Sequence, residues 1–166
     1  MAVTSSQSAQ VTLPADDQIL ITREFDAPKE LVYKAWTTPE LVKRWWHAKR
    51  GEVTIAEIDL RVGGKWRYVA VTDDGFEVAF HGEYREIVPE ERIVSTEVYE
   101  GAPQPEGEEQ GTLNTATFTE SDSRTTLTIL VQAPSKEIRD AIIESGMEAG
   151  MQDALDLLEE VAVSLG

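Results

Sequence analysis

Few residue types in this chain could carry out familiar catalytic chemistry. Only His47 and His81 could exchange protons near neutral pH. The chain has no cysteine, so it offers no thiolate nucleophile, no disulfide and no cysteine-based metal site. The sequence also lacks GxGxxG, P-loop, GxSxG and HExxH motifs. These absences favour binding over the common kinds of catalysis.

Both histidines have ordinary interpretations. His47 follows two tryptophans at the end of a predicted helix, where it could face a cavity mouth, interact with the helix C-terminus or be solvated. His81 alternates with Phe80 along a predicted strand, so it should point away from any cavity, on the same face as Glu83. One histidine and one carboxylate do not make a metal site. We therefore expect no metal and no cofactor.

Two tyrosines could orient a ligand. Tyr68 has the strand parity of Trp66. Tyr84 has the parity of Phe80, so both hydroxyl groups could point into one cavity. A cyclase-like enzyme would also need a buried acid whose pKa is raised toward neutrality. The candidate acids are Glu57, Asp59 and Glu86. We expect them to be solvated or paired with arginines such as Arg23, Arg67 and Arg85.

Strands and two short helices must position these residues. Residues Gln18–Phe25 alternate as a strand does, and Pro28 and Thr38-Pro39 are typical starts of two short helices. From Glu52 to Gln132 the composition favours strands, with turn signals such as Asp73-Asp74-Gly75 between them.

The last segment is predicted to be helical from Pro134 onward. Gly146 and Gly150 lie four residues apart and together cost a continuous helix about 2 kcal/mol relative to alanine. Either the helix kinks or restarts near Ser145-Gly146, or the bare backbone lets another element or a ligand come close.

This order of elements predicts an α+β fold. About seven antiparallel strands would form one curved sheet, with two short helices and a long C-terminal helix that the sheet grips. Residues 1–16 are predicted to be a flexible N-terminal tail, and residues 17–166 a single domain. Since a curved sheet and one helix do not interdigitate fully, we expect a cavity between them.

Six short motifs support a family resemblance. They are, in chain order, Arg23-Glu24-Phe25-Asp26-Ala27-Pro28, Trp36-Thr37-Thr38-Pro39-Glu40, Trp45-Trp46, Gly63-Gly64-Lys65-Trp66-Arg67-Tyr68, the run from Gly82 to Arg92, and Gly146-Met147-Glu148-Ala149-Gly150. Together they resemble the START-like (SRPBCC) superfamily, in the branch named after the C-terminal domain of the heat-shock-protein-90 ATPase activator. The resemblance covers roughly Gln18 to Leu165. It implies a helix-grip fold, whose central cavity binds small hydrophobic molecules such as lipids in many members.

Large side chains from the predicted helices and sheet should form the wall of this cavity. Any one of them could instead be ordinary core. The predicted ligand-binding residues are Trp36, Trp45, Trp46, Trp66, Tyr68, Phe80, Tyr84, Met147, Met151 and Leu155.

The charge balance excludes some partners. The chain carries 15 Lys+Arg against 31 Asp+Glu, a net charge of −16, which argues against nucleic acid and anionic membranes. No window approaches the ~20 apolar residues of a membrane span, so we expect no membrane insertion and a cytoplasmic location. The sequence leaves monomer and homodimer open.

The leading hypothesis is a protein that binds a small hydrophobic or aromatic molecule, without catalysis. One alternative is a cyclase- or hydrolase-like enzyme in the same cavity. The other is an interaction module acting on a chaperone or regulator. The resemblance weakens this alternative, because it covers only the activator's C-terminal domain. In the activator, the N-terminal domain does most of the chaperone binding.

Overall fold

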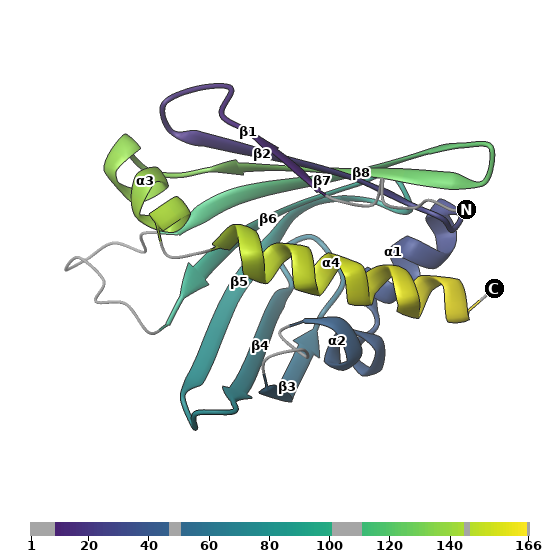
Figure 1. Ribbon diagram of the computed structural model, residues 1–166, viewed down its shortest axis with the longest axis horizontal. Coiled ribbons are helices and arrows are strands. Elements are labelled where there is room, and N and C mark those ends of the chain that lie inside the picture. The colour runs from purple at the N-terminus through teal and green to yellow at the C-terminus, as the bar shows by residue number, and fades with distance from the viewer. Residues whose placement is uncertain (1–8, 47–50, 101–110, 145–146, 166) are drawn as a thin grey trace.

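The computed structural model describes residues 9–46, 51–100, 111–144 and 147–165. An eight-stranded antiparallel sheet bends around the C-terminal helix, so that strands lie on both sides of it (Figure 1). This is the expected α+β helix-grip fold.

Eight strands and four helices are assigned within these residues. The strands are β1 (Gln10–Thr12), β2 (Gln18–Phe25), β3 (Gly51–Ile58), β4 (Lys65–Thr72), β5 (Glu77–Val88), β6 (Arg92–Tyr99), β7 (Thr112–Ser121) and β8 (Arg124–Gln132). The helices are α1 (Lys29–Thr37), α2 (Pro39–Trp45), α3 (Lys136–Glu144) and α4 (Met147–Ser164). The strand order across the sheet is β1-β2-β8-β7-β6-β5-β4-β3.

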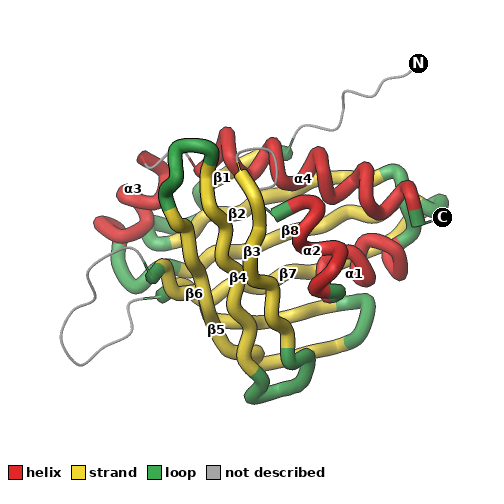
Figure 2. The backbone as a smooth tube through the Cα atoms, turned by 90° about the horizontal axis from the view of Figure 1, so that it is seen from below, coloured by secondary structure: helices red, strands yellow, loops and turns green. Residues whose placement is uncertain are grey.

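The short helices begin at the predicted prolines. Pro28 is the N-cap of α1, and Pro39 opens α2, where a missing N–H costs nothing. The indole Nε1 of Trp45 donates a hydrogen bond to the Ala35 carbonyl at 2.9 Å, which joins the two helices. Figure 2 shows α1 and α2 beside each other at one end of α4.

The N-terminal segment contributes a strand that we did not predict. Residues Gln10–Thr12 pair with Thr22–Leu20 of β2, so the sheet has eight strands rather than about seven. Ala9 is also buried, and its backbone exchanges two hydrogen bonds with the Gln152 side-chain amide of α4, at 3.0 and 2.9 Å. Residues 9–12 therefore belong to the domain rather than to a flexible tail. The sequence concealed this because an edge strand is held largely by backbone pairing, which carries no side-chain pattern.

The C-terminal segment forms two helices rather than one, as Gly146 and Gly150 suggested. Helix α3 ends at Glu144 and α4 begins at Met147, while residues 145–146 lie outside the described residues. A Cβ added at Gly150 would meet nothing within 4 Å. The restart of the helix is thus confirmed, and Gly150 is not a point of close approach to another element.

A buried arginine fastens α4 to the sheet. Arg23 of β2 is 1% exposed. Its guanidinium donates to Asp156 at 2.8 Å and to Glu159 at 3.0 Å, both on α4. It also lies 5.1 Å from the centre of the Phe25 ring. Since two carboxylates share one buried cation, removing the cation would leave both without their partner.

We predict that Arg23→Ala lowers the free energy of unfolding by about 3 kcal/mol, because the remaining carboxylates repel each other beside an apolar core. Chemical denaturation measures this loss. Arg61→Ala is the control, since Arg61 pairs with Asp59 on the exposed surface and should cost less than about 1 kcal/mol. Equal losses in the two variants would contradict the anchoring role of Arg23.

Candidate functional site

The concave face of the sheet, which we call the inner face, faces α4. Directly opposed residues in an antiparallel pair share a face, so the register identifies its members. Phe80 is opposite Tyr99, Tyr84 is opposite Ser95, and Tyr68 is opposite Phe80. The strand parity predicted for Tyr68, Phe80 and Tyr84 is therefore confirmed.

A continuous series of aromatic rings crosses one half of the inner face. We call it the aromatic row; its members are Trp66, Tyr68, Trp46, Phe80 and Tyr99. Successive ring centres are 4.8 Å (Trp66–Tyr68), 5.4 Å (Tyr68–Trp46), 5.8 Å (Trp46–Phe80) and 5.0 Å (Phe80–Tyr99) apart. These separations are those of attractive aromatic pairs. The row runs from buried Trp66 to Tyr99, which is 42% exposed.

A glycine lets the row lie close to the sheet. Gly82 of β5 is opposite Trp66, and a Cβ there would come within 2.6 Å of the indole nitrogen. That nitrogen donates a hydrogen bond to the Thr96 carbonyl of β6 at 3.2 Å. The indole of Trp66 therefore lies across β5, and a larger residue at position 82 would displace it.

A second aromatic group belongs to the helices. Trp36 and Trp45 stack at 5.2 Å, and the Trp36 ring meets Phe118 of β7 edge to face. Among the described residues no ring contact joins this group to the aromatic row. We interpret Trp36 and Trp45 as the packing of α1 and α2 on the sheet, rather than as a ligand wall.

All ten predicted wall residues fall within one hydrophobic cluster. Trp45, Trp66, Tyr68, Tyr84 and Leu155 are buried in it, and the other five are partly buried against it. The structure thus brings them together. None of the ten lines either of the two pockets described below and at the β6–β7 edge. A ligand-sized cavity between sheet and helix stays a prediction.

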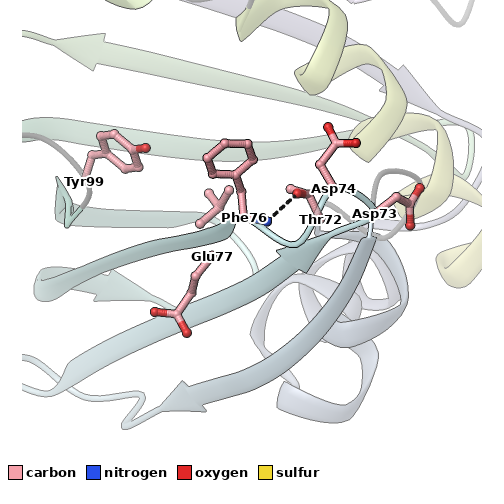
Figure 3. A pocket seen from close by; sticks show the side chains of 7 residues that line it. Thr72, Asp73, Asp74, Phe76, Glu77 and Tyr99 are labelled. Carbon is pink, nitrogen blue, oxygen red and sulfur yellow. Dashed lines mark hydrogen bonds between the residues drawn. The ribbon is translucent and has the colours of Figure 1, made fainter.

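One of these pockets adjoins the exposed end of the aromatic row. It has a volume of about 620 Å³ and is formed by the β4–β5 hairpin and the end of β6. Its lining residues are Thr72, Asp73, Asp74, Phe76, Glu77, Val78 and Tyr99. The rings of Phe76 and Tyr99 project to the same side of the strands (Figure 3). Phe76 is 71% exposed, so this pocket presents two aromatic side chains to solvent.

A carboxyl group lies on the inner face next to this pocket. Glu97 is two residues before Tyr99 on β6, with the same parity, and is partly buried. The Asn114 amide of β7 donates to Glu97 Oε1 at 2.9 Å, and the Thr112 hydroxyl donates to Asn114 Oδ1 at 2.9 Å. Among the described residues no cation pairs with Glu97. We call these three residues the carboxyl network.

Burial sets the protonation of this region. Removal from water raises the pKa of Glu97 to about 7, although the hydrogen bond from Asn114 acts in the opposite direction. Burial also raises the pKa of Tyr68 well above its usual value, with smaller contributions from Tyr84 and Glu97. The pKa of Tyr84 rises as well, mainly through burial. At neutral pH the inner face therefore holds two neutral phenols and a carboxyl that is about half ionised.

The three acids proposed from sequence are not at this site. Glu57 and Asp59 are exposed, and Asp59 pairs with Arg61. Glu86 accepts hydrogen bonds from Arg92, which lower its pKa. The expectation that all three would be solvated or paired is confirmed, although the partners are Arg61 and Arg92. The suggested arginines pair elsewhere: Arg23 with α4, Arg67 with Glu100 and Arg85 with Glu83.

Sequence reasoning missed Glu97 because β6 mixes apolar and polar residues on both faces. Ile93 and Glu97 share a parity, as do Val94 and Thr96, so alternation does not identify the inner face. The useful signal is the cross-strand pair Phe80–Tyr99, which requires knowing the register of β5 and β6.

The two histidines do not contribute to the inner face. His81 lies on the outer face as expected, and its Nδ1 is 2.8 Å from Glu100. Arg67 also binds Glu100, and its hydrogen bonds lower the pKa of that carboxyl to about 2. His47 lies outside the described residues.

Two further kinds of site are absent from the part of the chain that the structure describes. No cluster of three or more His, Cys, Asp or Glu side chains there could hold a metal ion. None of its helices is both long enough and apolar enough to span a bilayer.

Comparisons with known proteins identify the family. A family model described as "Activator of Hsp90 ATPase homolog 1-like protein" matches residues 26–162. No curated protein matches the sequence.

Similar solved structures extend over nearly the whole chain. A crystal structure from Rhodobacter sphaeroides is 24% identical, with a TM-score of 0.84, and the match covers 96% of this chain and 100% of that one. A solution structure from Arthrobacter aurescens is 25% identical, with a TM-score of 0.81 and coverage of 93% and 91%. One from Chromobacterium violaceum is 28% identical, with a TM-score of 0.76 and coverage of 89% and 98%.

The raised pKa of Glu97 makes stability depend on pH. The folded protein holds a proton that the unfolded chain releases near pH 4.5, so stability falls as pH rises from about 4.5 to about 7. We predict that Glu97→Gln is about 3 kcal/mol more stable than the wild type at pH 8 and equally stable at pH 4.

Urea denaturation at the two pH values measures this difference. Glu83→Gln, which removes an acid paired with Arg85 on the outer face, should show no such dependence. A wild-type protein whose stability rises between pH 5 and pH 7 relative to Glu97→Gln would contradict the assignment.

Proposed function

We propose, from the premise that this chain belongs to the Activator of Hsp90 ATPase homolog 1-like protein family, that it binds a small aromatic molecule on the inner face. The ligand would enter at the pocket beside Phe76 and Tyr99 and pack against the exposed end of the aromatic row. One observation carries this proposal: the row is continuous from Trp66 to an open pocket and passes beside the carboxyl network.

The composition of the site supports a small-molecule ligand. Binding sites for such ligands are typically apolar or aromatic, hold a few placed polar groups and have volumes of about 300–1,000 Å³. The pocket falls within this range at about 620 Å³. The aromatic row would supply contact area, while Glu97 and Asn114 would fix the orientation. Lipid binding and a deeper cavity are extensions of the same proposal.

Glu97 also favours a second candidate, an enzyme of cyclase or hydrolase type in the same site. A carboxyl with a pKa of about 7 can both donate and accept a proton at neutral pH. Tyr68 and Tyr84, which stay protonated, could donate hydrogen bonds to a developing negative charge. Turnover of a bound ligand that Glu97→Gln abolishes, without loss of binding, would distinguish this candidate from a carrier.

An interaction module gains less support from the outer sheet face. Among the described residues, Leu113 is the one exposed large hydrophobic residue on that face, and 36% of its surface is exposed. The others lie on hairpins, turns, helices and the end of the inner face. A single exposed leucine does not form a contiguous apolar patch.

We predict saturable, stoichiometric binding of N-phenyl-1-naphthylamine, a neutral aromatic probe that fluoresces in apolar surroundings. Phe80→Leu should weaken this binding about tenfold, because Phe80 joins Trp46 to Tyr99 in the row. Fluorescence titration measures both affinities.

Leu113→Ala is the matched control, since it removes an apolar side chain from the outer face and should leave the affinity unchanged. Absence of saturable binding to the folded wild type would overturn the proposed function. Equal weakening by both variants would contradict the placement of the ligand on the inner face.

A further inference from the structure

Negative charge predominates around the site. The pocket is lined by three acids, Asp73, Asp74 and Glu77, and the residues that form it include no lysine or arginine. Further in, Glu97 has Asn114 as its hydrogen-bond partner. The chain as a whole has a net charge of −16. A cation would therefore be attracted toward the site, and an anion would be repelled.

The carboxyl network leaves one acceptor available. Thr112 orients the Asn114 amide so that its NH₂ group faces Glu97 Oε1. Within the described residues, Oε2 of Glu97 accepts no hydrogen bond. Arg23, a buried cation of the inner face, lies on β2, three strands from β6, and binds Asp156 and Glu159. A ligand can thus supply the donor that the protein does not.

The aromatic row favours the same kind of ligand. Aromatic faces carry negative potential and attract ammonium groups within about 6 Å of the ring centre. Tyr99 is adjacent to Phe80 in the row, and it follows Glu97 by two residues on the same face of β6. Tyr99 therefore connects the pocket, which it lines, with the ring of Phe80 and with the Glu97 carboxyl on the same face of β6.

We propose that the inner-face site selects arylalkylamines, whose ring packs against Phe80 and Tyr99 while the ammonium group donates to the Glu97 carboxylate. This proposal rests on the proposed function and names its ligand class. An ammonium group donates a hydrogen bond to Oε2 of Glu97 and neutralises its partly buried charge. It is also attracted by the acidic residues that line the pocket. A carboxylate of the same size would meet Glu97, Asp73 and Asp74 as like charges.

Three indoles of matched shape test this proposal by calorimetry at pH 8. Tryptamine carries a cation, tryptophol a neutral hydroxyl group and indole-3-propionate an anion on the same two-carbon chain. We expect wild-type protein to bind tryptamine about tenfold or more tightly than tryptophol, and indole-3-propionate more weakly still. In Glu97→Gln the preference for tryptamine over tryptophol should fall to about twofold or less.

Glu83→Gln is the control, because it removes the same formal charge from the outer face and should keep the preference. Thermal unfolding verifies that each variant is folded. Equal binding of tryptamine and tryptophol to the wild type, or a preference that survives in Glu97→Gln, would overturn the arylalkylamine proposal while leaving aromatic binding intact. Failure of the folded wild type to bind any indole or the naphthylamine probe would overturn both.

Discussion

The fold depends on how one helix covers a wide, bent sheet. Eight strands spaced about 4.8 Å apart make a sheet roughly 34 Å wide, whereas a helix with its side chains is about 10 Å across. Helix α4 therefore covers only part of the inner face, even though the sheet bends around it. The rest must be covered by α1, α2 and large side chains or remain open to a ligand.

The two halves of the inner face meet this requirement differently. On β2, the buried Arg23 forms two ion pairs with α4, so the position of the helix is fixed there by charge and packing together. On β4, β5 and β6, aromatic rings contact one another, with Trp46 added from the end of α2. The first half is a closed interface. The second ends at exposed Tyr99 and an open pocket, and there the molecule can accept a further aromatic ring.

The sequence was a good guide to features that depend on local patterns. Pro28 and Pro39 predicted the helix starts, the two glycines predicted a restart near residue 145, and strand parity placed Phe80 and His81 on opposite faces. The motifs predicted the helix-grip fold. Features that depend on long-range pairing were missed. Strand β1 exists because its backbone pairs with β2, and its residues alone carry no such signal.

In the candidate site, too, local sequence patterns predicted some features, whereas features that depend on strand register were missed. The ten large side chains were correctly expected to come together, because apolar parity identifies a shared core. Parity alone could not separate the contacts of Trp36 and Trp45 within the helices from the row that leads to the pocket. Nor could it identify the partly buried acid, because Glu97 lies opposite Thr112 and accepts a hydrogen bond from Asn114 only once β6 and β7 are in register.

Glu97 is hard to explain by stability. Burial opposes its ionised form, so at neutral pH the protein is less stable than it would be with a neutral residue there. A glutamine could accept the same hydrogen bond from Asn114 and occupy nearly the same volume. The distinctive property of glutamate at this position is its negative charge, directed along a face that supplies aromatic rings and no free cation among its described residues. That property costs the folded chain stability, and it becomes favourable when a cationic group binds beside it.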